Sequence, residues 1–333
     1  MKVGIISFAH GHANKNARCL AQVPDVELTA IADCDEARLR AAVEQFGGDA
    51  YVDYRDLLAR DEIEAVLITS PNAEHREHVI AAAHAQKHIL CEKPIATTRA
   101  DGRAMIAACR EQGVKFQIAF PVRFSAPAAI LRQKVREGAV GTPLAVKATN
   151  PGRYPGGWFG DPALAGGGAV MDHTVHVADL LRWIFEAEIT QVYAEIDTRV
   201  HPDLPVDDVA TLMLVLSNGI FASLDPSWSR PKSWPTWGGL TMEVVGDRGV
   251  LAMDAFSQHL ELIEDGGPSY VFVPWTQGGD LPMIRSFIDA VRNDTDPLVT
   301  GEDGLRATEV ALCAYESAKR REPVACPGVL DGG

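Results

Sequence analysis

Residues 87–94 read KHILCEKP, and this stretch decides which fold we expect the chain to adopt. The apolar run 88–91 predicts a short buried strand, and Lys93 follows at its carboxyl end. In open parallel sheets, ligands bind beyond the carboxyl ends of the strands. Taken alone, however, a lysine and a proline after a strand are more typical of a surface turn. Whether Lys93 belongs to a functional site or to a surface turn therefore depends on the rest of the chain.

Short apolar runs alternate with helical patterns on both sides of this stretch. The runs cover residues 3–8, 26–33, 65–69, 88–91 and 115–119, and apolar residues recur at helical spacing over 35–46, 73–86 and 99–112. Such alternation is typical of a parallel sheet whose crossover helices lie on its faces. It predicts an α/β domain with a parallel sheet over residues 1–121.

The pattern changes after residue 121. A helix is expected at 125–137, a strand at 144–148 and a helix at 168–185, followed by strands at 189–197, 209–216, 220–227, 240–245, 250–253, 259–263 and 270–274. Turn sequences between these strands favour a mostly antiparallel open sheet. Helices are expected at 282–292 and 304–320. Residues 122–333 therefore predict a second, α+β domain. Its last helix can pack either within this domain or on the first domain.

Composition excludes several classes of function. The 333 residues are enough for two domains, and 45 acidic against 31 basic residues give a net charge of -14, which repels nucleic acid. The six cysteines show no C-x-x-C pair, which favours reduced thiols in a cytosolic protein. No leader or membrane-spanning run is evident. We expect a soluble, cytoplasmic protein that binds a small molecule and neither nucleic acid nor membrane.

The turn after the first strand reads SFAHGH over residues 7–12. The G-x-G-x-x-G spacing of dinucleotide-binding turns falls on Ser7, Ala9 and His12, so the fingerprint is degraded. Asp33 ends the second strand about 20 residues later, where a carboxylate binds the adenosine ribose. No arginine follows Asp33 directly, which favours NAD over NADP. The alternative is that Asp33 only caps the next helix.

His10 and His12 also fit an H-x-H metal site of a barrel hydrolase, with Asp172, His173, His176 or His201 as further ligands. The strand order does not match a (β/α)₈ barrel, so we expect no metal. A third interpretation is that both histidines lie in an exposed turn and flank the phosphates of a nucleotide.

Asp172 and His176 follow the glycine run 166–168 and are four residues apart, so they share one face of the predicted helix. Such a histidine can accept a hydroxyl proton while hydride leaves the same carbon, and the carboxylate can steady its charge. Lys93 can hold the substrate oxygen. The alternative is a surface ion pair of little energetic value. The glycines argue against it, because a glycine run before a helix lets a ligand reach the backbone amides.

The sequence resembles the Gfo/Idh/MocA family of NAD(P)-dependent oxidoreductases over nearly its whole length. The motifs that carry the resemblance are Glu92-Lys93-Pro94, Ser70-Pro71-Asn72 with His75, the glycine-rich approach to Asp172-x-x-x-His176, and Thr300-Gly301-Glu302-Asp303-Gly304. The resemblance implies a Rossmann domain and an α/β domain whose open sheet mediates dimers or tetramers. It also implies that Lys93 lies at substrate and nicotinamide, that His176 is the acid/base supported by Asp172, and that Asn72 and Glu92 lie near the cofactor. Ser7 and Ala9 depart from the glycines of the family.

The predicted site can be stated residue by residue. The catalytic residues are Lys93, Asp172 and His176. The residues expected to bind the cofactor, NAD rather than NADP, are Ser7, Phe8, Ala9, His10, His12, Asp33, Ser70, Pro71, Asn72, His75, Glu92 and Lys93. The residues expected to bind a sugar-like or polyol substrate are Arg123, Arg153, Tyr154, Trp158, His173, Trp228 and Arg230.

The predicted activity is hydride transfer between nicotinamide and a secondary alcohol or ketone of a sugar-like compound. The main alternative is a nucleotide-binding sensor of the same fold without chemistry, and a metal-dependent hydrolase using His10 and His12 is the third.

Overall fold

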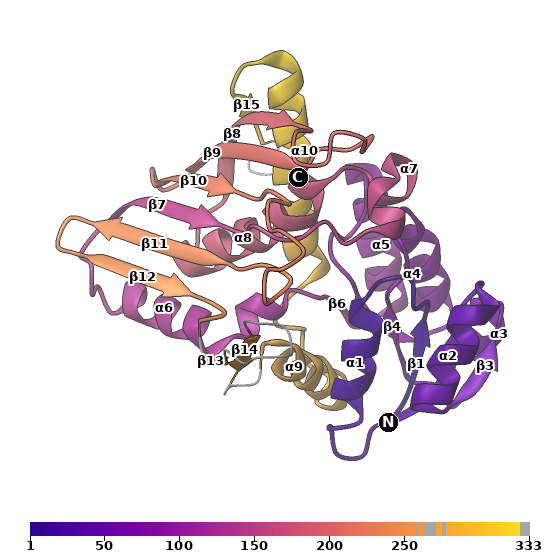
Figure 1. Ribbon diagram of the computed structural model, residues 1–333. Helices are drawn as coiled ribbons and strands as arrows, with labels where there is room; N and C mark the ends of the chain where they lie inside the picture. Colours follow the sequence, from indigo (N-terminus) through magenta and orange to yellow (C-terminus); the bar gives the residue numbers. More distant parts are fainter. Residues whose placement is uncertain (258, 263–270, 275–277, 327–333) are drawn as a thin grey trace. The chain divides into compact units, whose positions relative to one another are not determined.

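The computed structural model describes residues 1–257, 259–262, 271–274 and 278–326, and the chain forms two compact units (Figure 1). The first comprises Met1–Pro121, Ala163–Gly166 and Asp280–Leu305; the second comprises Val122–Pro162, Gly167–Gly279 and Arg306–Gly333. A boundary after residue 121 was predicted. Two later segments were expected in the second domain but belong to the first unit, because helix α9 (Asp280–Arg292) packs on helix α1 (His12–Leu20).

The first unit is built on a six-stranded parallel sheet in the order β3-β2-β1-β4-β5-β6. Its strands are β1 (Lys2–Ile6), β2 (Glu27–Ala32), β3 (Asp49–Tyr51), β4 (Ala65–Ile68), β5 (His88–Cys91) and β6 (Phe116–Ile118). The strand order reverses between β1 and β4, which is where doubly wound sheets bind their ligands. The predicted parallel α/β fold is confirmed.

Helices connect these strands. They are α1, α2 (Glu36–Phe46), α3 (Tyr54–Leu58), the 3-10 turn η1 (Asn72–Glu74) with α4 (His75–His84), and α5 (Arg99–Gln112). Local signals fix their ends: Asp35 caps α2 by accepting the amides of Ala37 and Arg38, and Thr98 caps α5 by accepting the amide of Asp101.

The second unit is built on a seven-stranded sheet in the order β12-β11-β7-β10-β9-β8-β15. Its strands are β7 (Pro143–Thr149), β8 (Ile189–Asp197), β9 (Val209–Leu216), β10 (Phe221–Asp225), β11 (Thr241–Gly246), β12 (Val250–Asp254) and β15 (Val324–Ala325). Strands β7 and β10 pair in parallel, and the other neighbours pair antiparallel. Strands β13 (His259–Leu262) and β14 (Val271–Pro274) form a separate antiparallel pair.

Helices α6 (Ala126–Arg136) and α8 (Ala169–Phe185) pack against the seven-stranded sheet. Along β9, the even-numbered residues 210–216 are buried and residues 211, 213 and 215 are exposed. One face of the sheet is therefore covered and the other is open. The remaining helical segments are η2 (Pro121–Phe124), η3 (Gly157–Gly160), α7 (Pro162–Ala165) and α10 (Gly301–Arg320). Among the described helices, none is long and apolar enough to cross a membrane.

Candidate active site

The carboxyl edge of the parallel sheet carries most of the residues that were expected to bind the cofactor. Ser7 follows β1, Asp33 follows β2, Ser70 follows β4, and Glu92 and Lys93 follow β5. Because these strands are parallel, their carboxyl ends lie along one edge of the sheet. The first unit therefore brings these side chains together, as their positions after the predicted strands indicated.

The turn after β1 forms without the usual glycines. Ser7 has a φ of 69°, a left-handed conformation that glycine adopts more readily. Its Oγ accepts the amide of Ala9 at 3.1 Å, which compensates part of the strain. The amide of His10 donates to the carbonyl of Thr69 at 3.0 Å and ties the turn to β4. Helix α1 then begins with no acidic residue in its first turn, so its positive end suits an anion.

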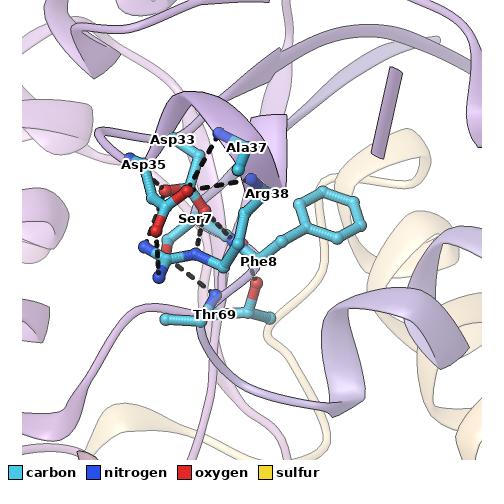
Figure 2. Close-up of polar contacts among 8 residues, drawn as sticks. Ser7, Phe8, Asp33, Asp35, Ala37, Arg38 and Thr69 are labelled. Carbon is cyan, nitrogen blue, oxygen red and sulfur yellow. Dashed lines mark hydrogen bonds and ion pairs between the residues drawn. The ribbon is translucent and has the colours of Figure 1, made fainter. Parts of the chain in front are cut away.

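Asp33 faces this turn, and its carboxylate is fully buried (Figure 2). It accepts the amides of Phe8 at 2.7 Å and Asp35 at 2.8 Å. The alternative that Asp33 caps the following helix is wrong, because Asp35 is the cap. No arginine follows Asp33 directly, but one from the next helix reaches it. Arg38, one turn into α2, donates to Asp33 through Nε at 3.1 Å and Nη2 at 2.8 Å.

Glu92 is buried at the end of β5 and receives three donors. Nδ1 of His12 lies 3.1 Å from Oε1, Nδ2 of Asn16 donates to Oε1 at 3.4 Å, and the amide of Lys93 donates to Oε2 at 3.3 Å. Burial by itself raises the pKa of Glu92, but the charge of His12 and its hydrogen bond outweigh this effect and hold the pKa of Glu92 well below its usual range. Glu92 is therefore an anion that positions His12 beside the first turn.

His10, His12 and Glu92 place three possible ligand atoms within 4.8 Å of one another. Their hydrogen bonds do not suit a metal. Nδ1 of His10 accepts the amide of His12 at 3.0 Å, so the proton of the neutral ring lies on Nε2. Nδ1 of His12 faces Glu92 instead. The two-unit fold is also not a (β/α)₈ barrel, so the hydrolase interpretation fails on both fold and donor chemistry.

His75 and Asn72 hold the loops beside Lys93. The fully buried ring of His75 places Nε2 3.1 Å from the carbonyl of Ser70 and Nδ1 3.0 Å from the carbonyl of Pro94. It thereby joins the loop after β4 to the loop after β5, where the Lys93–Pro94 peptide bond is cis. Asn72 donates to the carbonyl of Ala165 at 2.8 Å. Both residues support the site, and direct contact with a cofactor stays a prediction for them and for Pro71.

In the second unit, α8 carries Asp172, His173 and His176, all of them buried. Asp172 and His176 are each only 6% exposed, so the interpretation as a surface ion pair is wrong. Oδ2 of Asp172 accepts Nε1 of Trp228 at 3.1 Å and lies 3.2 Å from Nε2 of His173. Nδ1 of His173 faces the carbonyl of Pro226 at 3.0 Å. Because both ring nitrogens face oxygens, we infer that His173 is the cation of a buried ion pair with Asp172.

The glycine run before α8 has a different role from the one expected. The amides of Gly168 and Val170 donate to the two carboxylate oxygens of Asp207, at 2.9 and 2.8 Å, and the amide of Met171 donates to the hydroxyl of Tyr315 at 3.2 Å. A Cβ at Gly168 would lie 1.9 Å from the carbonyl oxygen of Asp207, and one at Gly167 would lie 2.1 Å from the hydroxyl of Tyr315. The glycines therefore permit close packing, and these amides are occupied by protein groups rather than open to a ligand.

Like His173, two further residues expected to line the substrate site are buried and pair with protein groups. Arg123 is buried and donates through Nε and Nη2 to Asp179 on α8. The indole of Trp228 is fully buried and orients Asp172, so it acts through that carboxylate. Spacing in the sequence did not reveal either partner, because each pair is separated by 56 residues.

The remaining residues that were expected to bind the substrate lie in the loops around β7 and β10. Tyr154 packs on Trp228 with ring centroids 5.2 Å apart, and Trp158 stacks on Phe159 at 3.9 Å. Arg230 lies 4.6 Å from the ring centroid of Trp234. Arg153 donates to the carbonyl of Lys232 at 3.3 Å, and its amide donates to the carbonyl of Trp237 at 2.7 Å. Residues 150–153 are thus bonded to the loop that carries Arg230.

Comparison with known proteins identifies the fold family. Residues 1–120 match the sequence model of an oxidoreductase family with an NAD-binding Rossmann fold, and residues 129–252 match the GFO/IDH/MocA C-terminal domain. The chain is 35% identical over 285 residues to 1,5-anhydro-D-fructose reductase from Ensifer adhaerens, covering 83% of this chain and 84% of that protein. The chain belongs to the Gfo/Idh/MocA family.

Two further matches cover nearly the whole chain. Myo-inositol 2-dehydrogenase from Thermotoga maritima is 28% identical, over 99% of this chain and 100% of that protein. The crystal structure of a probable dehydrogenase from Thermotoga maritima superimposes with a TM-score of 0.84 at 26% identity, covering 99% of this chain and 100% of that one. The predictions of family, of a two-part α/β architecture and of an oxidoreductase are confirmed.

Within this Gfo/Idh/MocA oxidoreductase, sequence reasoning missed three supporting groups. Asp207 and Tyr315 cap α8, and Arg38 occupies the carboxylate expected to bind ribose. Burial is the main cause that raises the pKa of Tyr315 well above its ordinary value, and Asp207 adds to it, so the hydroxyl is a neutral hydrogen-bonding group. Asp207 and Tyr315 are distant along the chain from the amides that they bind, and Arg38 follows the N-cap of α2. No local sequence motif predicts these contacts.

Proposed function

We propose that this enzyme transfers hydride between the nicotinamide of NAD and a secondary alcohol or ketone of a sugar or polyol. The observation that carries the proposal is the position of Asp33, Glu92 and Lys93 at the carboxyl edge of a sheet with the order β3-β2-β1-β4-β5-β6. The relatives named above act on 1,5-anhydro-D-fructose and myo-inositol, which supports a polyhydroxylated substrate.

The residues of the first unit fit a dinucleotide. Asp33 presents a carboxylate beside the turn after β1, and the N-terminus of α1 lacks acidic residues. A carboxylate accepts ribose hydroxyls and repels a 2′-phosphate, which is the physical reason for proposing NAD as the preferred cofactor. His12, held by Glu92 at the same turn, adds a group suited to the pyrophosphate.

Three side chains have roles in the proposed oxidation of an alcohol, and the reaction balances in charge and in protons. Bound NAD⁺ supplies the hydride acceptor. We assign the hydroxyl proton of the alcohol to His176, the substrate oxygen to the ammonium of Lys93, and the support of the protonated ring to Asp172. Oxidation then yields a ketone, NADH and protonated His176. Trp228 and His173 keep Asp172 in one orientation, so they position it without touching the substrate themselves.

For the substrate, we propose that Arg153, Tyr154, Trp158 and Arg230 supply aromatic surfaces and hydrogen-bond donors. Aromatic rings with arginines suit a polyol or sugar, including one that carries a carboxylate. Arg123, which pairs with Asp179, does not take part in this assignment.

We also propose that two copies associate through the open face of the seven-stranded sheet. Paired residues form a row across this face: Val250, Val245, Ala145, Phe221 and Val215. Phe221 is 51% exposed and Val250 is 57% exposed. An apolar row of this kind on a monomer is typical of a protein interface.

A thermal-shift screen followed by an activity panel tests the proposal. NAD and NADP are added separately to the purified protein, and the better ligand is then combined with inositols, aldoses, anhydro sugars and sugar acids while absorbance at 340 nm is followed. Stabilisation by NAD together with turnover of a polyol or sugar is expected. Stabilisation by a dinucleotide without turnover of any compound favours the sensor, and no dinucleotide binding contradicts the proposal.

A further inference from the structure

Arg38 donates to both carboxylate oxygens of Asp33, the group that we expect to bind the ribose of a dinucleotide. We infer that Arg38 competes with the cofactor for Asp33 and thereby weakens NAD binding while making the site tolerant of NADP. The inference rests on the proposed function, because it assumes that the ligand at this edge of the sheet is a nicotinamide dinucleotide.

The Asp33 carboxylate already accepts as many hydrogen bonds as its two oxygens allow. Oδ1 accepts the amide of Asp35 at 2.8 Å and Nη2 of Arg38 at 2.8 Å. Oδ2 accepts the amide of Phe8 at 2.7 Å and Nε of Arg38 at 3.1 Å. Two carboxylate oxygens offer about four acceptor sites. All of these are taken, so the hydroxyls of a ribose can bind only after a donor leaves.

Among these donors, Arg38 is the one that can leave. The amides of Phe8 and Asp35 belong to the backbone that follows β1 and β2, so they are fixed with the sheet. The side chain of Arg38 is 40% exposed, whereas that of Asp33 is 0% exposed. Figure 2 shows this side chain folded back from α2 onto Asp33 and Asp35. Its Nη1 also donates to Asp35, at 3.2 Å, so Arg38 has a second acceptor to keep when it releases Asp33.

Displacement of Arg38 costs affinity for NAD. Binding exchanges a two-point, charge-assisted contact for hydrogen bonds from neutral hydroxyls, and charge-assisted contacts are about twice as strong. Because the guanidinium is partly exposed, water and Asp35 compensate part of the loss. We expect the cost to lie between threefold and thirtyfold in Kd.

For the 2′-phosphate of NADP, displacement of Arg38 favours binding rather than opposing it. The phosphate faces the negative charges of Asp33 and Asp35, but a displaced guanidinium beside them can donate two hydrogen bonds to phosphate oxygens. Glu74 is close enough to take part in the same balance: burial is the main cause that raises its pKa, Arg38 opposes this and Asp33 adds to it. Without Arg38, the phosphate would meet the carboxylates of Asp33 and Asp35 with no cation among the partners that the structure shows for Asp33.

The test compares two arginines of the same helix. Arg40 is exposed on α2, so Arg40→Ala removes an equal charge from this helix without a contact to Asp33. Arg38→Ala and Arg38→Met remove the guanidinium, and the methionine variant keeps an apolar stem in case the alanine variant folds poorly. Calorimetric titration of each purified full-length protein with NAD and with NADP gives the two dissociation constants.

Both Arg38 variants should bind NAD three- to thirtyfold more tightly than wild type, and the ratio of the NADP to the NAD dissociation constant should widen at least tenfold. Arg40→Ala should stay within twofold of wild type for both cofactors. Unchanged or weaker NAD binding in the Arg38 variants overturns the inference, because Arg38 would then help the cofactor rather than compete with it. Absence of dinucleotide binding by the wild type instead contradicts the proposed function itself.

Discussion

Ser7 shows how a single residue can keep a backbone shape that its side chain does not favour. Its φ of 69° costs about 1 kcal/mol relative to glycine, and the bond from the amide of Ala9 to its Oγ offsets part of this cost. The backbone of the turn is thus formed by hydrogen bonds where the usual glycines are missing. A degraded glycine fingerprint is therefore a weak argument against a dinucleotide-binding fold.

His78, whose Nδ1 lies 2.9 Å from Oγ of Ser70, provides a test of the electrostatics near the end of β4. Burial lowers the pKa of His78 from 6.5 to about 4, and the nearby His75 adds to the effect. Between these two values the unfolded chain binds a proton and the folded chain does not, so stability falls as the pH falls. At pH 5 the loss relative to pH 7.5 amounts to about 2 kcal/mol for this group.

The comparison with His78→Gln isolates this contribution. Glutamine does not titrate, and His75 and His88, whose pKa values burial also lowers, remain in both proteins. Urea unfolding at pH 7.5 and pH 5 should therefore show a loss that is about 2 kcal/mol smaller in the variant. An equal loss in the two proteins would mean that His78 does not resist protonation in the folded state.

At the scale of secondary structure, prediction succeeded where the pattern was long or regular. The predicted bounds of β5, β8, β9 and α5 coincide with the observed ones. Strand β3 and helix α3 were missed, since they have three and five residues and β3 is an edge strand with little apolar pattern. Helix α9 was assigned to the second domain because position along the chain does not reveal which unit a helix packs on.

For the candidate site, the sequence predicted the elements that carry the residues more than it predicted their contacts. Helical spacing placed Asp172 and His176 on one helix, and α8 contains both. The carboxylate of Asp207 that caps this helix lies 39 residues from Gly168, and the hydroxyl of Tyr315 lies 147 residues away. Partners brought together by tertiary folding leave no local signal, so the glycines were misread as openings for a ligand.

The ion pair on α8 leads to a spectroscopic prediction. If His173 donates from both ring nitrogens to Asp172 and Pro226, a nitrogen-15 spectrum of histidine-labelled protein at pH 7.5 should contain a ring with two protonated nitrogens. Asp172→Asn should remove this signal. Trp228→Phe, which deletes the other donor to Asp172, should preserve it.

Two results would contradict the ion pair. A spectrum in which no doubly protonated ring responds to Asp172→Asn would place the shared proton on the carboxyl group. A signal lost equally in Trp228→Phe would show that packing around the indole, rather than the charge of Asp172, maintains it.

At the scale of the whole molecule, the open sheet face predicts an assembly. Phe221→Lys places a charge in the middle of the apolar row, whereas Thr211→Lys places the same charge on the same face two rows away, opposite Glu195. Burying an unpaired ammonium is costly, so Phe221→Lys should dissociate the oligomer. Sedimentation of both variants and the wild type at equal concentration measures this.

Thr211→Lys should retain the mass of the wild type in that comparison. A monomeric wild type, or an oligomer that survives Phe221→Lys unchanged, would exclude this face as the interface.

In the function that we propose, hydride transfer depends on His176 as the acid/base. Single-turnover formation of NADH, followed with the polyol or sugar that the activity panel identifies, measures it most directly in wild type and His176→Ala. We expect the variant to bind NAD within about twofold of wild type and to form NADH roughly 10² to 10⁴ times more slowly. NADH formation at a near-wild-type rate in His176→Ala would show that His176 is not the acid/base.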